Sequence, residues 1–229
     1  MKQVLDKGFV RLVDSMGDDM SVVKSARVSY GEESKGDKAD KGLINYMMKH
    51  NHGTPFEHIV FTFHIKCPIF IARQWFRHRI GSFNEISGRY VKLDEEYYLP
   101  EIYRENTSDN KQRSTNNKDL TDKAEIQYKR AMNYAYGFYN HLLHMGVARE
   151  QARAVLPLGT YTEFYWTVNA RSLMNFIKLR GSSDAQWEIQ EYARVIYEMV
   201  NEICPWTMKA FWKIGKLEKE WGRKNESSI

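Results

Sequence analysis

The chain has 229 residues, a formal net charge of +5 at pH 7 and 28% charged residues. This length suffices for one substantial hydrophobic core, so we expect a single domain over residues 1–229. The excess of positive charge suits anionic ligands but is modest for a protein dedicated to nucleic acid. No apolar run approaches the roughly 18 residues of a membrane span, and Met1–Val4 begins no apolar targeting segment. We therefore expect a cytoplasmic protein with neither a nucleic-acid nor a membrane partner.

The chain contains two cysteines, Cys67 and Cys204, each beside a proline in an apolar stretch. We expect both to be reduced core residues without a disulfide. Because no Cys-x-x-Cys pair and no histidine-rich cluster is present, the sequence predicts no metal site.

The first part of the chain predicts a strand and two helices. Alternating hydrophobicity predicts a strand over Phe9–Asp14, and Gly17–Asp19 offers a cap for a helix through Ser21–Arg27. A second, amphipathic helix is expected to carry its apolar residues on one face, namely Leu43, Ile44, Tyr46, Met47 and Met48.

The clearest strand signal is the β-branched and aromatic run Ile59–Lys66. Pro68 suits the first turn of a helix that we expect over Ile69–Arg77. Helical spacing would place three polar side chains at the mouth of a cleft: Gln74, Arg77 and His78.

The second part of the chain is mainly helical. Residues 94–121 are polar and rich in Asn and Ser, which predicts a partly mobile surface excursion of low functional content. A strand is expected over Tyr161–Asn169, running directly into a helix. Other helices are predicted over Asp122–His144, Arg149–Pro157, Ala185–Cys204 and Pro205–Trp212, with a frayed terminus over 215–229. Too few strands are present for a doubly wound sheet, so we expect an α+β fold with a small mixed or antiparallel sheet flanked by long helices.

Residues 77–90 hold an unusual concentration of anion-binding groups. Three arginines, a histidine, two serines and two glycines occur within this segment. Arginine binds phosphate bidentately, and glycine lets backbone N–H groups approach an oxyanion. The alternative is a basic surface loop, since most charge clusters are solvated. The strongly apolar segment that precedes these residues favours a binding site.

The pattern Arg-His-Arg-x-x-Ser-x-Asn-x-x-Ser-x-Arg-Tyr in this segment resembles the signature of the flavin-dependent thymidylate synthases. This resemblance extends from about Val10 to Trp206 and fails over residues 94–121. It implies reductive methylation of dUMP to dTMP, with 5,10-methylenetetrahydrofolate as carbon donor and FAD, reduced by NADPH, as hydride donor. It also implies a homotetramer whose active sites are shared between subunits.

The same resemblance implies roles for individual residues. Those expected to bind dUMP are Gln74, Arg77, Glu85, Ile86, Ser87, Gly88, Arg89, Arg153 and Arg180. Those expected to bind FAD are His52, Thr54, Glu57, Arg77, His78, Arg79, Glu85, Asn169, Arg171 and Asn175. Arg180 is expected to be catalytic, by stabilising the ionised N3 of uracil, and Arg89 to clamp the phosphate. Asp184 departs from the pattern, because many members have a histidine there.

Several of these residues also have simpler interpretations. Taken alone, Arg153 and Arg171 could be helix-surface residues paired to Glu150 and Glu163. Likewise, Thr54-Pro55 is a good turn, and Glu57 with His58 could form a solvated pair.

Nucleophilic catalysis by this chain is not favoured. Ser82 and Ser87 lack a nucleophile-elbow motif, and the arginines on either side of His78 would lower its pKa and weaken it as a base. Neither cysteine lies in an electropositive motif. We therefore expect polarisation of the uracil ring instead of attack by an enzyme thiolate. The alternatives are a non-catalytic nucleotide- or RNA-binding module and a flavoprotein reductase with another substrate.

Overall fold

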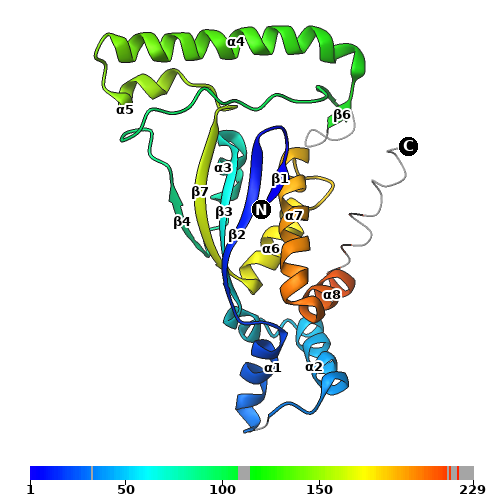
Figure 1. The fold of residues 1–229 in the computed structure, drawn as a ribbon. Coiled ribbons are helices and arrows are strands. Elements are labelled where there is room, and N and C mark those ends of the chain that lie inside the picture. Colours follow the sequence, from blue (N-terminus) through cyan, green and yellow to red (C-terminus); the bar gives the residue numbers. More distant parts are fainter. Residues whose placement is uncertain (32, 108–113, 216, 218–220, 222–229) are drawn as a thin grey trace.

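A computed structural model describes residues 1–31, 33–107, 114–215, 217 and 221. Its centre is an antiparallel sheet with the strand order β1-β2-β3-β7-β4 (Figure 1). These strands span Lys2–Val4, Gly8–Met16, Val60–Pro68, Tyr161–Asn169 and Ser82–Glu85, in that spatial order. A separate hairpin consists of β5 (Arg104–Asn106) and β6 (Ser114–Asn116). The expected α+β class and antiparallel sheet are confirmed.

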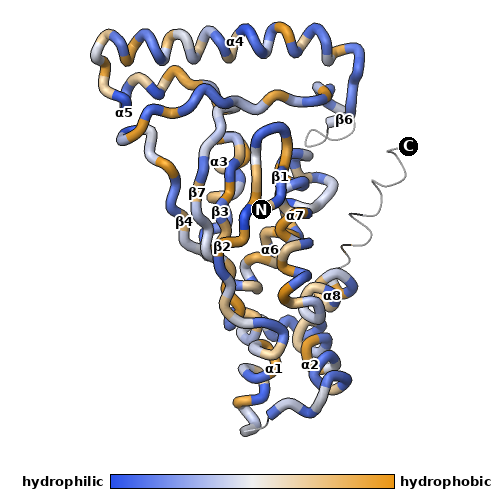
Figure 2. The backbone as a smooth tube through the Cα atoms, in the orientation of Figure 1, coloured by the Kyte–Doolittle hydropathy of each residue, from blue (hydrophilic) through white to orange (hydrophobic). Residues whose placement is uncertain are grey.

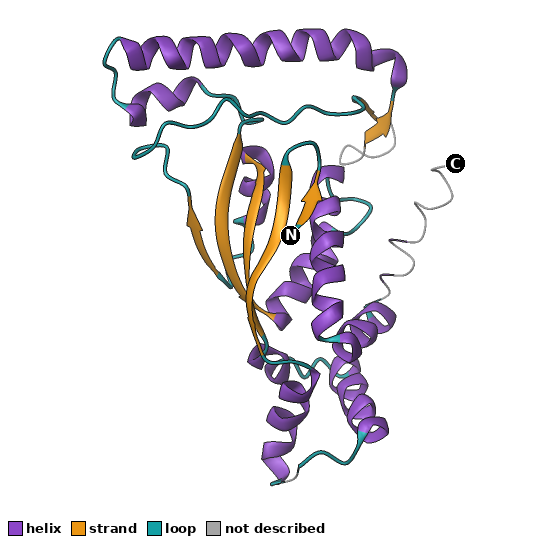
Figure 3. Cartoon of the chain, viewed as in Figure 1, coloured by secondary structure: helices purple, strands orange, loops and turns teal. Residues whose placement is uncertain are grey.

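Helices cover one face of the sheet and both of its ends. The α-helices are α1 (Asp19–Arg27), α2 (Asp37–Lys49), α3 (Ile69–Trp75), α4 (Lys118–His144), α5 (Arg149–Ala152), α6 (Ala170–Arg180), α7 (Trp187–Ile203) and α8 (Pro205–Ile214). Short 3₁₀ helices are η1 (Val28–Tyr30), η2 (Thr54–His58) and η3 (Arg153–Val155). The long helix α4 crosses one end of the sheet, and α1 and α2 lie at the other (Figures 1 and 3). Among the described residues, no helix is long and apolar enough to cross a bilayer.

The two central strands contribute to the core because their side chains alternate between buried and more exposed over Val60–Cys67 and Thr162–Asn169. Phe63 of β3 pairs with Trp166 of β7, and both side chains are fully buried. Next to them, Trp75 of α3 stacks on Phe176 of α6, with ring centroids 4.7 Å apart. This aromatic cluster holds α3 and α6 against the same face of the sheet.

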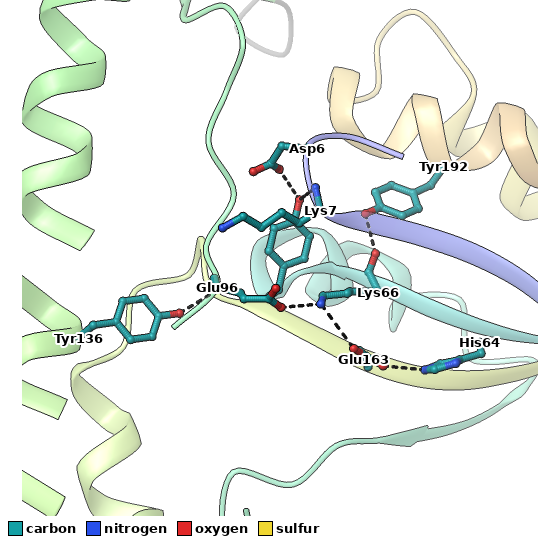
Figure 4. Close-up of polar contacts among 9 residues, drawn as sticks. Asp6, Lys7, His64, Lys66, Glu96, Tyr136, Glu163 and Tyr192 are labelled. Carbon is teal, nitrogen blue, oxygen red and sulfur yellow. Dashed lines mark hydrogen bonds and ion pairs between the residues drawn. The ribbon is translucent and has the colours of Figure 1, made fainter. Parts of the chain in front are cut away.

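The opposite face of the sheet is polar, as the alternation of blue and orange along its strands indicates (Figure 2). Lys66 lies between Glu96, at 2.5 Å, and Glu163, at 3.7 Å (Figure 4). Glu163 also contacts His64 Nε2 at 2.9 Å. Burial alone would lower the pKa of Lys66, but the hydrogen bonds and charges of Glu96 and Glu163 together outweigh it, so the pKa is raised. This lysine therefore stays charged and ties the excursion that contains Glu96 to the sheet.

Several predicted elements differ from the structure. The helix expected over Ile69–Arg77 ends at Trp75, because Phe76 packs against Phe83 and Phe164 and draws the chain toward β4. Strand β4 itself lies inside the segment expected to be a loop. Tyr46, expected on the apolar face of its helix, is 56% exposed. Strands β1, β5 and β6 were not predicted, because runs of three residues carry no readable alternation.

The excursion over 94–121 is anchored more firmly than its composition indicates. Tyr98 is buried and its N–H donates to the Gly159 carbonyl, while the Tyr161 N–H donates to the Glu96 carbonyl. The last residues of the excursion already belong to α4, which begins at Lys118 after the side-chain cap of Asn117. The expectation of a purely surface segment is therefore wrong for these residues, while 108–113 lie outside the described residues.

The frayed terminus expected over 215–229 is also wrong where the structure describes it. Leu217 is fully buried, and the Trp221 ring packs edge-on against Trp212 at 5.2 Å. Apolar burial thus continues past α8. Residues 216, 218–220 and 222–229 lie outside the described residues.

Gly8 is a position where the fold depends on the absence of a side chain. A Cβ added there would lie 2.0 Å from the Tyr192 hydroxyl and 2.8 Å from the Lys66 carbonyl oxygen, two groups joined by a 2.7 Å hydrogen bond. We expect Gly8→Ala to lower the free energy of unfolding by about 2–3 kcal/mol through overpacking. Urea denaturation would measure the change.

Gly42→Ala is the matched control for this substitution. Gly42 lies inside α2, where an added Cβ has no atom within 4 Å. This substitution should raise the free energy of unfolding by about 0.5–1 kcal/mol, because alanine loses less backbone entropy in a helix. Equal effects of the two substitutions would contradict the packing argument.

Candidate functional site

The predicted site residues fall into three groups, and the first joins α3 to the end of α6. Arg180, the last residue of α6, donates from Nε to His78 Nε2 at 2.9 Å and from Nη2 to the Gln74 carbonyl at 3.1 Å. The His78 ring packs edge-on against Phe176, with centroids 5.0 Å apart. Arg77 is close enough to Arg180 to lower its pKa, after burial as the larger cause. The structure thus brings four predicted residues together from segments about 100 residues apart in sequence.

Electrostatics keep His78 neutral in this group. Partial burial, and then the Arg180 charge, lower the pKa of His78 to about 4. The expected direction was correct, but its main causes are burial and Arg180, not the arginines adjacent in sequence. Because Nε2 accepts from Arg180, the ring proton lies on Nδ1, which remains able to donate.

The cations of this group are not neutralised by carboxylates. Among the described residues, no Asp or Glu forms an ion pair with Arg77, Arg79 or Arg180. Like charges that repel one another are stabilised when an anion binds between them. The group is therefore suited to a phosphate or to an anionic ring.

Gln186 belongs to this group although no role was predicted for it. Its Oε1 accepts a 2.6 Å hydrogen bond from Gln74 Nε2. Gln186 occupies the N-cap position of α7, yet its side chain makes no capping bond. The sequence signal that could have revealed this role is a glutamine at a helix N-cap, where Ser, Thr, Asp or Asn is preferred. The bond fixes which way the Gln74 amide faces.

The second group surrounds the turn after β4. The Thr162 hydroxyl donates to Glu85 Oε1 at 2.6 Å, and the Ile86 N–H donates to the Glu163 carbonyl at 2.9 Å. Ser87 accepts from the Arg89 N–H through its hydroxyl, at 3.3 Å. The turn is therefore held against β7 while its remaining polar groups face outward.

Two arginines, Arg89 and Arg153, also belong to this second group. A Cβ on the buried Gly88 would lie 3.1 Å from Arg153 Cδ, so the chain passes directly beside that side chain. Arg89 Nε contacts Glu150 at 3.1 Å, with both side chains about half exposed. Glu150 thus pairs with Arg89, not with Arg153 as in the surface interpretation. Such an exposed pair contributes about 0–1 kcal/mol, so an incoming phosphate could displace the carboxylate.

The third group lies where η2 meets the start of α6. Arg171 pairs with Glu57 at 2.6 Å, not with Glu163, and a Cβ on Gly53 would lie 2.5 Å from Arg171 Nε. Asn169 caps α6 by accepting from the Ser172 N–H at 2.9 Å. Three further predicted residues are exposed beside these: His52, Thr54 and Asn175.

The first and third groups lie at opposite ends of α6. Arg171 and Arg180 are nine residues apart on this helix, which separates them by about 14 Å along its axis. Among the described residues, hydrogen bonds and ion pairs connect members within each group but not between groups. The three groups therefore do not form one cleft by direct contacts within a single chain, while the three residues expected at one cleft mouth, Gln74, Arg77 and His78, do lie together in the first group.

A cavity of about 470 Å³ lies elsewhere, between β1, residues 98–101 and α7. None of the predicted site residues lines it. Asp6, on its wall, already accepts hydrogen bonds from the Tyr161 hydroxyl and the Leu99 N–H.

The residues present fit a flavin dinucleotide, whose diphosphate is anionic. The cations without carboxylate partners, Arg77 and Arg79, match that charge. No Gly-x-Gly-x-x-Gly segment is present, so a dinucleotide would bind to helix ends and loops and not in the Rossmann manner. Among the described residues, no cluster of acidic, histidine or cysteine side chains could hold a metal ion.

Neither cysteine is prepared to act as a nucleophile. Cys67 is fully buried, which raises the pKa of its thiol well above the usual value. Burial likewise raises the pKa of Cys204 to about 12. The interpretation of both as reduced core residues is confirmed.

Comparison with known families gives a consistent result over most of the chain. The model of a family described as "Thymidylate synthase complementing protein" matches residues 11–206. The flavin-dependent thymidylate synthase of Thermosipho africanus is 58% identical over 213 residues, covering 92% of this chain and 93% of that protein. The enzyme of the same name from Thermus thermophilus is 55% identical, covering 91% of this chain and 77% of that protein.

A solved structure has the same fold. The UMP/dUMP methylase PolB from Streptomyces cacaoi, in a crystal structure with bound 5-Br dUMP, superposes with a TM-score of 0.87. It is 36% identical, and the match covers 93% of this chain and 98% of that one. At this identity the likeness extends beyond general topology.

The neutrality of His78 has a measurable consequence. Because its folded-state pKa of about 4 lies below the ordinary value of 6.5, the unfolded chain takes up a proton that the folded chain resists. The free energy of unfolding should therefore fall as the pH drops from 6.5 toward 4, by at most about 2 kcal/mol because the side chain is only partly buried. Urea denaturation of His78→Gln should lack this component.

His144→Gln is the matched control, since His144 lies on α4 away from the group. It should keep the dependence on pH seen in the unmodified protein. If His78→Gln and the unmodified protein lost the same free energy of unfolding between pH 6.5 and pH 4, the assignment of a neutral imidazole to His78 would be wrong.

Proposed function

Because the chain belongs to the flavin-dependent thymidylate synthase family, we propose that it methylates dUMP to dTMP with 5,10-methylenetetrahydrofolate as carbon donor and FAD, reduced by NADPH, as hydride donor. The observation that carries this proposal is the cationic group of Arg77 and Arg180 around a neutral His78. The similarity to enzymes named for flavin dependence and to a dUMP methylase supports it. A cytoplasmic protein of one domain over residues 1–229 is part of the same proposal.

The substrate's uracil ring is the group that Arg180 would stabilise. Two of its N–H groups are used by His78 and Gln74, and the remaining donors are free for a ligand. A guanidinium held in this way favours negative charge on the N3–C4–O4 side of uracil, which makes C5 more nucleophilic. With both thiols buried, this route needs no enzyme nucleophile.

The remaining groups would position dUMP. Gln74, oriented by Gln186, presents an amide to the base. The turn over Glu85, Ile86, Ser87 and Gly88 supplies backbone and hydroxyl donors beside it. Arg89 and Arg153 flank this turn, and the phosphate would replace Glu150 as the partner of Arg89.

A bound FAD would supply the hydride. His52, Thr54, Glu57, Asn169, Arg171 and Asn175 would hold it together with Arg77, His78, Arg79 and Glu85. Arg171, fixed by Glu57, would offer its outer N–H groups to the diphosphate. Asp184 stands in place of the histidine common in the family, which we expect to alter the affinity for oxidised flavin.

Shared active sites would reconcile the separated groups. Residues at opposite ends of α6 can serve one ligand set if the third group of one subunit faces the first group of another. We therefore include a homotetramer with shared sites in the proposal. Sedimentation equilibrium of the purified protein would measure its mass.

The activity is tested by anaerobic incubation of the purified protein with FAD, NADPH, methylenetetrahydrofolate and dUMP. We expect dTMP, and none when any one of these is omitted. Oxidation of NADPH without dTMP would identify a reductase with another substrate. Failure to take up FAD, together with salt-dependent binding of polynucleotides, would favour the nucleic-acid-binding alternative.

Arg180→Ala is expected to lower kcat by about 10²–10³-fold, as does the loss of one preorganised donor to a developing oxyanion. Lys178→Ala is the matched control, because Lys178 is an exposed cation on the same helix, outside the three groups. Anaerobic single-turnover measurement of dTMP formation would separate the two. Equal rates of dTMP formation in the two variants would show that Arg180 takes no part in the chemical step.

Gln186→Leu is expected to raise the KM for dUMP about fivefold with little change in kcat, because it removes a hydrogen bond of about 1 kcal/mol. Gln186→Glu retains the acceptor for Gln74 and should restore most of the affinity. If Gln186 acts only through its bond to Gln74, adding Gln186→Leu to Gln74→Leu should not raise the KM for dUMP further. Additive losses would show that the two residues act separately.

A further inference from the structure

The short segment 181–186 joins two members of the first group, since it follows Arg180 and ends at Gln186. The position of Arg180 therefore depends on where this segment begins. Gly181, its first residue, is buried although it has no side chain, whereas residues 182–184 are exposed or partly exposed. Another part of the chain must therefore cover the backbone at this point.

The indole ring of Trp221 provides this cover. A Cβ added to Gly181 would lie 2.4 Å from Trp221 Cζ2, 2.6 Å from Nε1 and 2.7 Å from Cε2. The ring is held in turn by Tyr197 of α7 and Trp212 of α8, with centroids 5.4 and 5.2 Å away. Edge-to-face pairs of this kind each contribute about 0.5–1.5 kcal/mol. A ring held by two helices thus lies directly against the backbone beside Arg180.

The contact also accounts for the glycine at position 181. The φ angle of Gly181 is −83°, which is right-handed helical and open to any residue, so the backbone conformation does not require glycine. The ring of Trp221 is what leaves no room for a side chain. Close packing of this kind transmits a displacement of the ring to the end of α6.

The guanidinium of Arg180 is sensitive to such a displacement. It is held by His78 Nε2 at 2.9 Å and by the Gln74 carbonyl at 3.1 Å. Both hydrogen bonds would be lost beyond about 3.5 Å. A shift of well under 1 Å in the adjoining backbone would therefore change the partners of Arg180.

Apolar packing, not a hydrogen bond, fixes the Trp221 ring. Its Nε1 is buried and has no hydrogen-bond partner among the residues that the structure describes. An unpaired buried donor costs about 1–3 kcal/mol. A phenylalanine at this position would keep a ring against Gly181 without that cost, so it is the conservative substitution for a test.

We propose that Trp221 is a positioning residue, whose ring fixes Gly181 and so holds the guanidinium of Arg180 in place. The consequence for catalysis rests on the proposed function, in which Arg180 stabilises charge on the uracil ring. Trp221 lies outside the stretch that matches the family, so membership assigns it no role.

The position of Arg180 is measurable without any substrate. Its charge and its hydrogen bond to Nε2 both favour the neutral imidazole of His78. In Trp221→Ala we expect Arg180 to move away, so the pKa of His78 should rise from about 4 toward 6.5 in an NMR titration of ring-labelled histidine. Trp206→Ala is the matched control, because it removes a partly buried indole that contacts Lys41 instead of Gly181. It should leave this pKa unchanged.

Kinetics test the same contact in the reaction. We expect Trp221→Ala to lower kcat for dTMP formation about 10–100-fold, with the KM for dUMP changed less than about twofold, because a misplaced catalytic group slows the chemical step. Trp221→Phe should restore most of kcat. Gly181→Ala should lower kcat as well, and combining it with Trp221→Ala should cost no more than the worse single change, because both disrupt one contact.

The proposal is overturned if Trp221→Ala leaves either the His78 pKa or, in a protein that forms dTMP, kcat unchanged, or if Trp206→Ala alters both equally. A raised His78 pKa in a protein that forms no dTMP would support the positioning of Arg180 by Trp221 and contradict only the proposed reaction. Circular dichroism would verify that each variant is folded, and Gly181→Ala carries the same two measurements if Trp221→Ala does not fold.

Discussion

The stacking of Trp75 on Phe176 is the contact on which the arrangement of the candidate site depends. Trp75 ends α3, which follows β3, and Phe176 lies in α6, which follows β7. Because β3 and β7 are antiparallel, the two helices leave the sheet at opposite ends, and the aromatic contact brings them back together. It is this contact that places His78 beside Arg180. The arrangement of the candidate site therefore rests on a fully buried apolar cluster.

The site derives its chemistry from cations that remain unpaired. Where arginines meet carboxylates, as Arg89 meets Glu150, the pairs are exposed and weak enough to be exchanged for a phosphate. Where they are partly buried, as for Arg180, the neighbours are a neutral imidazole and a carbonyl oxygen. Under the proposed function, this distribution would keep positive charge available for the uracil ring and leave the phosphate contacts reversible. The buried thiols add no competing nucleophile.

The geometry of α6 connects this chemistry to assembly. One helix carries Arg171 at its first turn and Arg180 at its last residue, so one chain separates the third group, expected to bind flavin, from Arg180, expected to bind the base. Assembly would therefore complete the site instead of merely stabilising it.

The sequence by itself determined the family, the two central strands and the set of residues proposed for the site. Those properties follow from local spacing: the pattern over residues 77–90 and the alternation in β3 and β7 are readable without knowing what lies nearby. The tertiary structure alone decided the partners. Arg171 pairs with Glu57 and not Glu163, and Gln186 orients Gln74, because these contacts depend on which strand edges and helix ends meet. The short edge strand β4 and the packed, partly buried Trp221 were missed for the same reason, since their stability comes from distant residues and not from their own pattern.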